Sequence, residues 1–389
     1  MVGTLPGRTQ GLGLITEPLL ADFQLDRLTY AQLNLWATII GSAGALGIGR
    51  LIDRAGGRIA LTLVASLLGM VCIGMSLTSS FAMLAVAVTL TRALGQSALS
   101  VVSLAMVGHW FARRINSAMA VYSIVMSIGF MATFPVVGAA VQRSGWRSAW
   151  LAIGLALVVV LAPLGWLVVR RAPEDVAEKT SATDGYVWTD AIRTPAFWVF
   201  AIGAALYGLV ASGIGLFNES ILAERGFGPE VYYNTLAVTA ITALAGNFAG
   251  GWLSAPVGSE DPASMRLPLG RLMATALTVL AAGLVVLPHL TSLTHVMAWA
   301  TLMGLGGGLV MVLFFSVWPR VYGRRELGRI QGIAQALTVL ASAVGPVLLA
   351  WCVDVTGSYA VMFRVLAGVV AIAALAAALT PMPPRVSER

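Results

Sequence analysis

Residues 49–58 read Gly49-Arg50-Leu51-Ile52-Asp53-Arg54-Ala55-Gly56-Gly57-Arg58, a short charged segment between two long apolar runs. Each flanking run is long enough to cross a bilayer, for which about 20 apolar residues suffice. The segment is too short to hold a domain, and its glycines permit a sharp reversal of the chain. Because arginine-rich short loops stay on the cytoplasmic side of a membrane, it indicates a membrane protein and predicts which side this turn faces.

The composition of the chain agrees with a lipid environment. Hydrophobic residues make up 58% of the 389 residues and charged residues only 11%, whereas soluble domains contain about 25% charged residues. The net charge of +7 is spread over short loops between apolar runs, which is typical of an orientation signal rather than a nucleic-acid surface. Cys72 and Cys352 lie far apart in apolar runs. We therefore expect them to pack in the protein, with no disulfide framework, metal site or cofactor.

The apolar runs predict twelve transmembrane helices with both ends of the chain on one side. The runs lie near 1–22, 29–49, 59–78, 81–108, 118–140, 148–170, 193–218, 231–255, 269–288, 292–318, 329–351 and 359–379. The loops that this count assigns to the cytoplasm, with the C-terminal tail, carry 17 Lys and Arg residues, and the opposite loops carry five. The bias predicts cytoplasmic termini in a multi-pass protein of a bacterial-type inner (cytoplasmic) membrane.

A polar interval divides the chain into two similar halves. It predicts an N-terminal six-helix bundle over 1–170, a cytoplasmic linker over 171–192, and a C-terminal six-helix bundle over 193–389 that ends in a short tail. The halves are predicted to be a parallel repeat, giving an all-α membrane protein built from two pseudo-symmetric bundles. The matching pairs at one constant offset are Tyr30 and Tyr232, Gly44 and Gly246, Gly49 and Gly251, and Leu51 and Leu253; Arg113-Arg114 recurs as Arg324-Arg325.

The 49–58 segment resembles the signature loop between helices 2 and 3 of the major facilitator superfamily of transporters. Two further segments are similar to the branch that contains monocarboxylate porters and oxalate/formate exchangers: His109-Trp110-Phe111-Ala112-Arg113-Arg114 and Ser144-Gly145-Trp146-Arg147-Ser148-Ala149-Trp150. The resemblance implies a monomer that works by rocker-switch alternating access about a midplane site. It also implies a set of gating residues at the cytoplasmic face. These are Gly49, Asp53, Arg54, Arg58, Arg113 and Arg114.

Charges inside the spans are the clearest candidates for a binding site, since each costs about 2.5–3.5 kcal/mol at mid-helix on insertion scales. Arg92 lies near the middle of the run 81–108 and resembles the arginine of the superfamily's helix-4 pattern. It either forms a positive point in the central cavity, or orients helices by pairing with Glu17 or with carbonyl oxygens. Glu17 is either a proton-coupling carboxylate or one that Arg92 or Arg8 neutralises. Arg8 is either a site residue or a snorkelling residue at the membrane interface.

The first run is polar for a span, which fits either a cavity-lining helix or a chain whose natural start lies upstream. Other polar and aromatic residues in the spans either touch substrate or join helices. These residues are Asn34, Trp36, Tyr122, Tyr207, Ser212, Asn247, Trp299, Gln331 and Gln335. The three histidines have no partners at metal-ligand or catalytic spacing, so we expect a protein that is not an enzyme.

The sequence as a whole predicts a secondary transporter of a small organic monoanion, with the proton as candidate coupling ion. A single intramembrane arginine suits a monoanion better than a dianion, which needs a second basic group. The expected partners are therefore the small-molecule substrate, protons and the lipid bilayer, and no nucleic acid. Two alternatives stay open: efflux of amphipathic compounds from a cavity lined by Met and Trp, and a transport-inactive membrane sensor.

Overall fold

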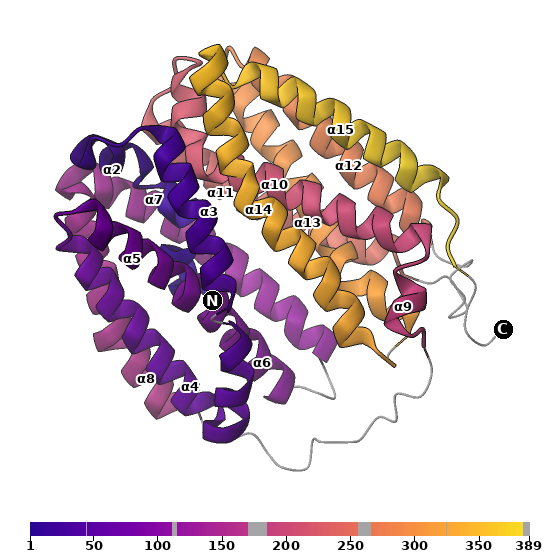
Figure 1. Cartoon of the computed structure of the whole chain (residues 1–389), viewed down its shortest axis with the longest axis horizontal. Helices are drawn as coiled ribbons and strands as arrows, with labels where there is room; N and C mark the ends of the chain where they lie inside the picture. Colours follow the sequence, from indigo (N-terminus) through magenta and orange to yellow (C-terminus); the bar gives the residue numbers. More distant parts are fainter. Residues whose placement is uncertain (44, 111–114, 170–184, 256–265, 324, 384–389) are drawn as a thin grey trace. The chain divides into compact units, whose positions relative to one another are not determined.

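A computed structural model describes the chain (Figure 1) except residues 44, 111–114, 170–184, 256–265, 324 and 384–389. The side chains at 43, 45–50, 52–54, 108, 109, 115–120 and 328 also lie outside the description. Nearly all the described residues are helical, and the one β-bridge among them joins Gly185 to Gly323. The all-α class is therefore confirmed.

The chain forms two compact units. The first contains Met1–Lys179 together with Ile214–Ala223 and Gly228–Tyr233, and the second contains Thr180–Gly213, Glu224–Phe227 and Asn234–Arg389. Two segments of the C-terminal half, Ile214–Ala223 and Gly228–Tyr233, therefore belong to the first unit.

The helices follow one another along the chain in the order that Figure 1 shows. From the N-terminus they are η1 (Val2–Gly7), α1 (Thr9–Gly13), α2 (Thr16–Phe23), α3 (Arg27–Ala43), α4 (Ala45–Ser76), α5 (Phe81–Thr91), the π-helical η2 (Arg92–Leu99), α6 (Ser100–Trp110), α7 (Ile115–Leu155), the π-helical η4 (Ala156–Leu161) and α8 (Ala162–Val168). Then come α9 (Trp188–Ala191), α10 (Pro195–Ala223), α11 (Pro229–Leu253), α12 (Leu269–Val286), the 3-10 turn η7 (Leu287–His289), α13 (Leu293–Tyr322), α14 (Leu327–Thr356) and α15 (Ala360–Leu379).

The described helices account for twelve crossings. Nine helical segments among the described residues are long and apolar enough to span a membrane. One of these, Val121–Val168, holds two crossings, because the chain reverses at Gly145 (φ 78°, ψ 158°). The short helices over Val2–Phe23 supply the first crossing (helix 1), α3 with the start of α4 supplies the second (helix 2), and the rest of α4 supplies the third (helix 3). Helix 4 consists of α5, η2 and α6, and helices 5 and 6 are the parts of the chain from α7 to α8 before and after Gly145. Helices 7 to 12 are α10 to α15 in order.

The 49–58 segment is more helical than the sequence predicted. The helix that contains it continues as α4, and the reversal occurs at the single residue Gly56, with φ 83° and ψ 157°. A residue with a Cβ is strained at such a φ, which explains why glycine stands there. The expected helix ends at 49 and 59 are therefore wrong, although the predicted reversal is confirmed.

The first crossing is not the continuous helix 1–22 that the sequence predicted. It breaks at Arg8, which is extended (φ −82°, ψ 151°), and again at Ile15 (φ −119°, ψ 4°). Gly7, Gly11 and Gly13 lower the helix propensity of this stretch. Broken helices are tolerated in membranes only where protein or a water-filled cavity surrounds the freed backbone.

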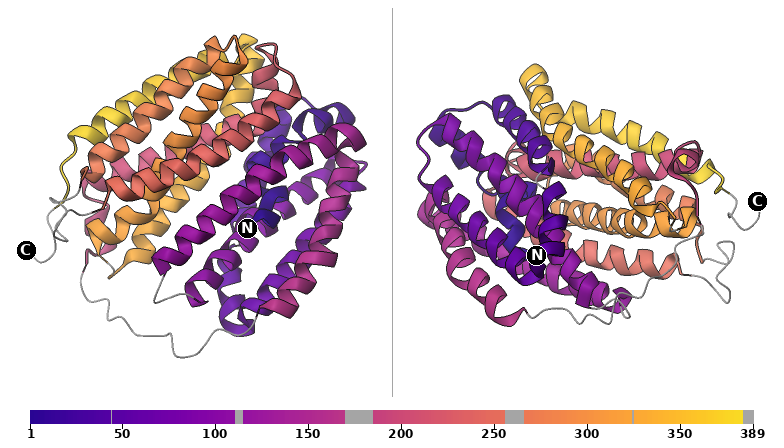
Figure 2. Two further views of the ribbon diagram at one scale, coloured as in Figure 1. Left: turned by 180° about the vertical axis from the view of Figure 1, so that it is seen from behind. Right: turned by 60° about the horizontal axis from the view of Figure 1, so that its bottom comes forward.

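Small residues bring the helices of the second unit close together. A Cβ at Gly308 of α13 would collide with the carbonyl oxygen of Ala243 in α11, and one at Gly304 would collide with the hydroxyl of Thr242. Without a hydrophobic driving force between helices in lipid, such close packing holds the bundle together. In the same unit α12 lies beside α15 in every view (Figures 1 and 2).

Candidate functional site

Arg92 sits at the centre of a buried hydrogen-bond network in the first unit. It opens the π-helical segment η2, and its side chain is only 2% exposed. Nη1 donates to Thr9 Oγ1 (2.8 Å) and Gln96 Oε1 (2.7 Å), and more weakly to the carbonyl oxygen of Gly7 (3.4 Å). Nη2 donates to Asn34 Oδ1 (2.9 Å). The arginine therefore holds the first break of helix 1 against helices 2 and 4, and π-helical turns are frequent at functional sites.

Arg8 lies at the same break, between Gly7 and Thr9, which both accept hydrogen bonds from Arg92. Its Nε donates to Thr4 Oγ1 (2.7 Å), and its guanidinium lies 5.2 Å from the centre of the Phe130 ring. The hydroxyl of Tyr122, another predicted site residue, lies 3.1 Å from Ser103 Oγ. Arg8 is half-buried, whereas Arg92 is fully buried. Arg8 is thus the more accessible of two neighbouring cations.

Neither cation is neutralised by a carboxylate among the described residues. The ion pairs that the description contains are Arg27–Glu17, Arg147–Asp22, Arg225–Glu224 and Arg329–Glu326. Glu17 lies in the first turn of α2 and pairs with Arg27 at 2.8 Å. Among the described residues Glu17 therefore pairs with Arg27 and with neither Arg92 nor Arg8, and no described carboxylate compensates the two positive charges at the break of helix 1.

A second carboxylate, Glu219, was missed by the sequence analysis. The expected span 193–218 ended one residue before it, whereas α10 continues to Ala223 and changes direction at Phe217 (φ −113°, ψ 15°). Glu219 belongs to the first unit, and its Oε2 is buried and accepts no hydrogen bond from any described residue. Electrostatic interactions link it to Glu17, Tyr232 and Tyr233.

The remaining predicted site residues of the C-terminal half lie in the second unit. Tyr207 of α10 places its hydroxyl against Gly307 of α13, where a Cβ would collide with it. Trp299 of α13 is buried, Asn247 of α11 is half-buried, and Gln335 of α14 is exposed. These positions show packing for Tyr207 and Trp299, and a role in binding stays a prediction for all four.

Most of the predicted gating residues lie outside the description. This holds for the side chains of Gly49, Asp53 and Arg54, and for Arg113 and Arg114. Arg58 is described: its guanidinium stacks on the Trp166 ring, 4.1 Å from the ring centre.

The segment Ser144–Trp150 has a structural role at the reversal that joins helices 5 and 6. After the turn at Gly145, the Trp146 Nε1 donates to Asp22 Oδ2 (2.7 Å). Arg147 approaches the same carboxylate (3.5 Å) and donates to the carbonyl oxygen of Thr78 (2.9 Å). The motif therefore ties the ends of helices 1, 3 and 6 together.

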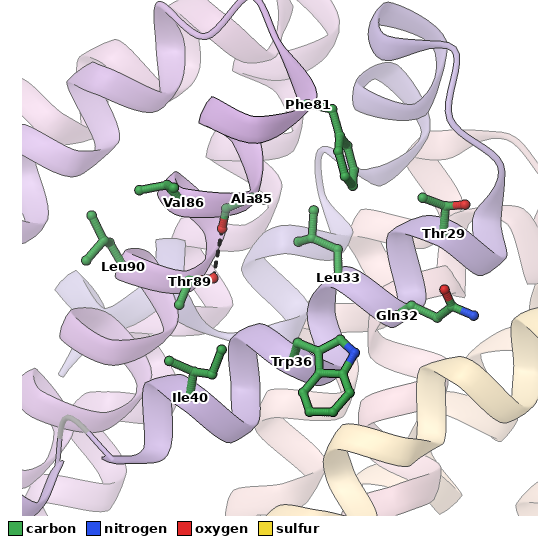
Figure 3. A pocket seen from close by; sticks show the side chains of 10 residues that line it. All are labelled: Thr29, Gln32, Leu33, Trp36, Ile40, Phe81, Ala85, Val86, Thr89 and Leu90. Carbon is green, nitrogen blue, oxygen red and sulfur yellow. Dashed lines mark hydrogen bonds between the residues drawn. The ribbon is translucent and has the colours of Figure 1, made fainter.

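An apolar groove of about 590 Å³ lies between α3 and α5 (Figure 3). Trp36, which is 61% exposed, projects from α3. The hydroxyl of Thr89 donates to the carbonyl oxygen of Ala85 in its own helix, at 2.8 Å, and so offers no free donor to a ligand. The other lining residues are Thr29, Gln32, Leu33, Ile40, Phe81, Val86 and Leu90. The groove suits an apolar or amphipathic molecule.

Comparison with known proteins identifies the class. A family model described as the Major Facilitator Superfamily matches residues 9–270 and 261–389. The chain therefore belongs to the major facilitator superfamily, and it is a multi-pass membrane protein. The resemblance stated from the signature segment is confirmed.

Individual relatives are more distant. The chain is 25% identical to monocarboxylate transporter 13 of Rattus norvegicus over 266 residues, which are 68% of this chain and 59% of that protein. It thus spans about three fifths of that transporter's length. It is 26% identical to an MFS-type efflux pump of Mycolicibacterium smegmatis over 276 residues, covering 67% of this chain and 62% of the pump.

Solved structures show the same fold. A bacterial homolog of the human lysosomal transporter Spinster, in an inward-facing and occupied conformation, matches with a TM-score of 0.66 and 16% identity, over 97% of this chain and 91% of that one. The twelve-helix, two-bundle architecture is therefore shared with a solved transporter.

Proposed function

We propose that this transporter moves small organic monoanions, with protons as the coupling ion, and that Arg8 and Arg92 form the positive pole of its site. The observation that carries the proposal is the pair of cations at the break of helix 1, neither of which is ion-paired with a described carboxylate. An intramembrane charge costs about 2.5–3.5 kcal/mol on insertion scales. A bound anion would offset that cost for both arginines.

The two arginines have different tasks in this proposal. Arg92 donates hydrogen bonds to protein atoms from both terminal nitrogens, so it fixes the backbone of the break and contributes charge. Arg8 is half-buried, and its Nε donates to Thr4 Oγ1. Its two terminal nitrogens are therefore left to bind a carboxylate through two parallel hydrogen bonds. One such pair matches one carboxylate group.

The similarity to a monocarboxylate transporter over 68% of this chain supports the same substrate class. The arginine-rich turns support cytoplasmic termini, and with them a cytoplasmic position for the reversal at Gly56. Asp53 near this turn is proposed to hold the cytoplasmic face shut in one state. Asp53→Asn should then reduce transport while binding is kept, and loss of binding would overturn the gating role.

Counterflow into proteoliposomes tests the anion site. Labelled pyruvate, lactate and formate are compared for the wild type, Arg8→Ala, Arg92→Ala and Arg92→Lys, with Arg364→Ala on the exposed face of α15 as the matched control. Losing a charge-assisted hydrogen bond costs about 1.5–3 kcal/mol, so Arg8→Ala should weaken apparent affinity about 10- to 150-fold. Arg92→Ala should abolish uptake, and Arg92→Lys should retain part of it.

The same preparation also shows when the proposal fails. Folded wild-type protein without uptake of any of the three anions would overturn the substrate class. Equal affinities for Arg8→Ala and Arg364→Ala would remove Arg8 from the site, whatever the substrate.

The second candidate function is efflux of amphipathic compounds, and the groove between α3 and α5 favours it (Figure 3). The similarity to an efflux pump points the same way. Uptake of a fluorescent lipophilic cation into energised inverted vesicles would support it, provided that Trp36→Ala reduces the rate and Leu375→Ala on the exposed face of α15 does not.

A further inference from the structure

The internal repeat extends through the two broken helices. Tyr30 and Tyr232 are 202 positions apart, and the same offset aligns residues 11–21 with residues 213–223. The first stretch reads Gly-Leu-Gly-Leu-Ile-Thr-Glu-Pro-Leu-Leu-Ala and the second reads Gly-Ile-Gly-Leu-Phe-Asn-Glu-Ser-Ile-Leu-Ala, so that six of the eleven positions are identical. Glu17 and Glu219 are therefore equivalent residues of the two halves.

The backbone repeats in the same register. Ile15 has φ −119° and ψ 4°, and its counterpart Phe217 has φ −113° and ψ 15°. Downstream, Gln24 and Gly226 both have positive φ, at 52° and 83°. The following helices α3 and α11 begin at the equivalent positions 27 and 229. Helices 1 and 7 are thus interrupted at the same place, and such paired interruptions mark binding sites in transporters built from repeats.

The two interruptions meet inside the first unit. A Cβ at Gly13 of α1 would collide with the carbonyl oxygen of Gly215 in α10, and would lie 2.9 Å from the Tyr232 hydroxyl. Glu17 and Glu219 each follow this contact by four residues. Each has one buried carboxylate oxygen, Oε1 of Glu17 and Oε2 of Glu219, that accepts no hydrogen bond from a described residue. The two carboxylates interact electrostatically.

The two halves of the repeat differ in whether an arginine is present to pair with the carboxylate. Glu17 is paired with Arg27, but the position equivalent to Arg27 is Pro229. Among the described residues, the other titratable groups that interact with Glu219 are Tyr232 and Tyr233 of α11, which carry no positive charge. Two interacting carboxylates are therefore served by one arginine, and the interaction between like charges destabilises the doubly ionised state.

We propose that Glu219 is the proton-binding residue of this transporter and that its proton holds the α1–α10 contact closed. With the proton on Glu219, Glu17 and Arg27 form a neutral pair and the contact is stable. When the proton leaves for water, Glu219 and Glu17 repel each other and the two broken helices separate. The inference deepens the proposed function, because it names the residue through which protons act, and it does not depend on the identity of the substrate.

Two readouts test the proposal separately from the substrate. The first is amide hydrogen exchange in nanodiscs, measured at several pH values for the peptides covering 9–23 and 214–233. At each pH the exchange of a peptide is compared with that of the same peptide in Glu219→Gln. The second is the pH dependence of anion counterflow. We compare the wild type with Glu219→Gln, with Glu17→Gln and with Glu230→Gln, which replaces an exposed carboxylate in the first turn of α11.

In the wild type, exchange in both peptides should rise with pH relative to Glu219→Gln, which should stay protected throughout. Glu17→Gln removes the like charge and frees Arg27. The pH at which exchange rises, called the transition below, should therefore fall by about one pH unit, and the rise itself should persist. Glu230→Gln should match the wild type. Pro229→Arg restores the arginine of the first half, and it should move the transition toward acid as well if it folds with the wild-type melting temperature.

The outcomes separate this inference from the anion proposal. A contact whose pH dependence disappears in Glu219→Gln, in a protein that moves none of the three anions, would uphold the proton site and overturn the substrate class. Anion counterflow with an unaltered pH profile in Glu219→Gln, together with unaltered exchange, would overturn the proton site alone. A transition that disappears in Glu17→Gln and persists in Glu219→Gln would assign the proton to Glu17.

Discussion

Replacing Gly13 with alanine should push the transporter out of the state in which α1 contacts α10. In that state the added Cβ would overlap the carbonyl oxygen of Gly215, which belongs to the backbone and cannot turn aside as a side chain can. The matched control is Gly215→Ala. The nearest atoms to its Cβ would be Gln10 Cγ at 3.5 Å, Thr9 Cγ2 at 3.7 Å and Gln10 Cδ at 3.8 Å, which are ordinary van der Waals distances.

The size of the effect follows from the overlap. Overpacking a tight contact by one carbon costs about 1–3 kcal/mol, and the cost disappears once the helices have separated. The helix propensity gained by replacing glycine with alanine, about 1 kcal/mol, applies in both states and cancels. The ratio of separated to closed molecules should therefore rise about 5- to 160-fold for Gly13→Ala, and less than about twofold for Gly215→Ala.

Thiol labelling can measure this ratio. Thr16 is 1% exposed and lies beside the second break of helix 1, so a cysteine placed there should react with a maleimide only when the contact opens. The native Cys72 and Cys352, which are both buried, are replaced by alanine. Equal labelling rates in Gly13→Ala and Gly215→Ala would refute the reasoning, because the two variants would then have the same population of separated molecules.

Three further predictions concern the stability of the fold. Gly56→Ala should lower the melting temperature in detergent, because a Cβ at φ 83° costs about 1–2 kcal/mol, whereas Gly74→Ala in the same helix has free space around the added Cβ and should not. Arg147→Ala should destabilise the protein by about 1–2 kcal/mol, seen as a lower melting temperature, through lost hydrogen bonds to carbonyl oxygens at the end of α4. Hydrogen bonds from the side chain and backbone N–H of Thr29 lower the pKa of the Asp26 carboxyl; its stabilising contribution is therefore present above about pH 4 and lost as the pH falls further, and Asp26→Ala should remove this part of the acid sensitivity of the melting temperature.

The sequence predicted the features of this fold that arise from long, averaged signals. Twelve apolar runs were found because the hydropathy signal of a span is summed over about 20 residues. The reversal was found because glycines such as Gly56 lie in a short charged segment between two apolar runs. The breaks at Ile15 and Phe217 gave no such signal. Each is a change in the dihedral angles of one apolar residue, which does not alter a hydropathy signal summed over about 20 residues.

The candidate site was predicted in part for a related reason. Arg92 and Asn34 were identified from their polarity within spans, and the structure places them 2.9 Å apart. The pairing of Glu17 with Arg27 was missed because Arg27 was assigned to a loop, and helix boundaries are the least certain feature of a sequence-based assignment. The same uncertainty excluded Glu219 by a single residue. Extending the offset that relates Tyr30 to Tyr232 would have found it, since that signal needs no boundary.

The two halves of the repeat keep the same backbone but differ in their cations. Ser80 caps α5 by accepting from the backbone N–H of Met83, and Ser292 caps α13 by accepting from that of His295. These caps set an offset of 212 residues for helices 4 and 10, and at that offset the counterpart of Arg92 is Gly304. The arginine at the centre of the network is therefore present in one half only.

The glutamate, in contrast, is kept in both halves, as Glu17 in the first and Glu219 in the second, whereas the position of Arg27 is occupied by Pro229 in the second half. A symmetric protein with arginine at both positions would neutralise both carboxylates, and neither would respond to pH. A symmetric protein with proline at both would leave two uncompensated charges at a buried contact. Only the asymmetric arrangement leaves a single carboxylate to gain or lose a proton as the contact closes or opens, and the arginine at position 27 determines that this carboxylate is Glu219.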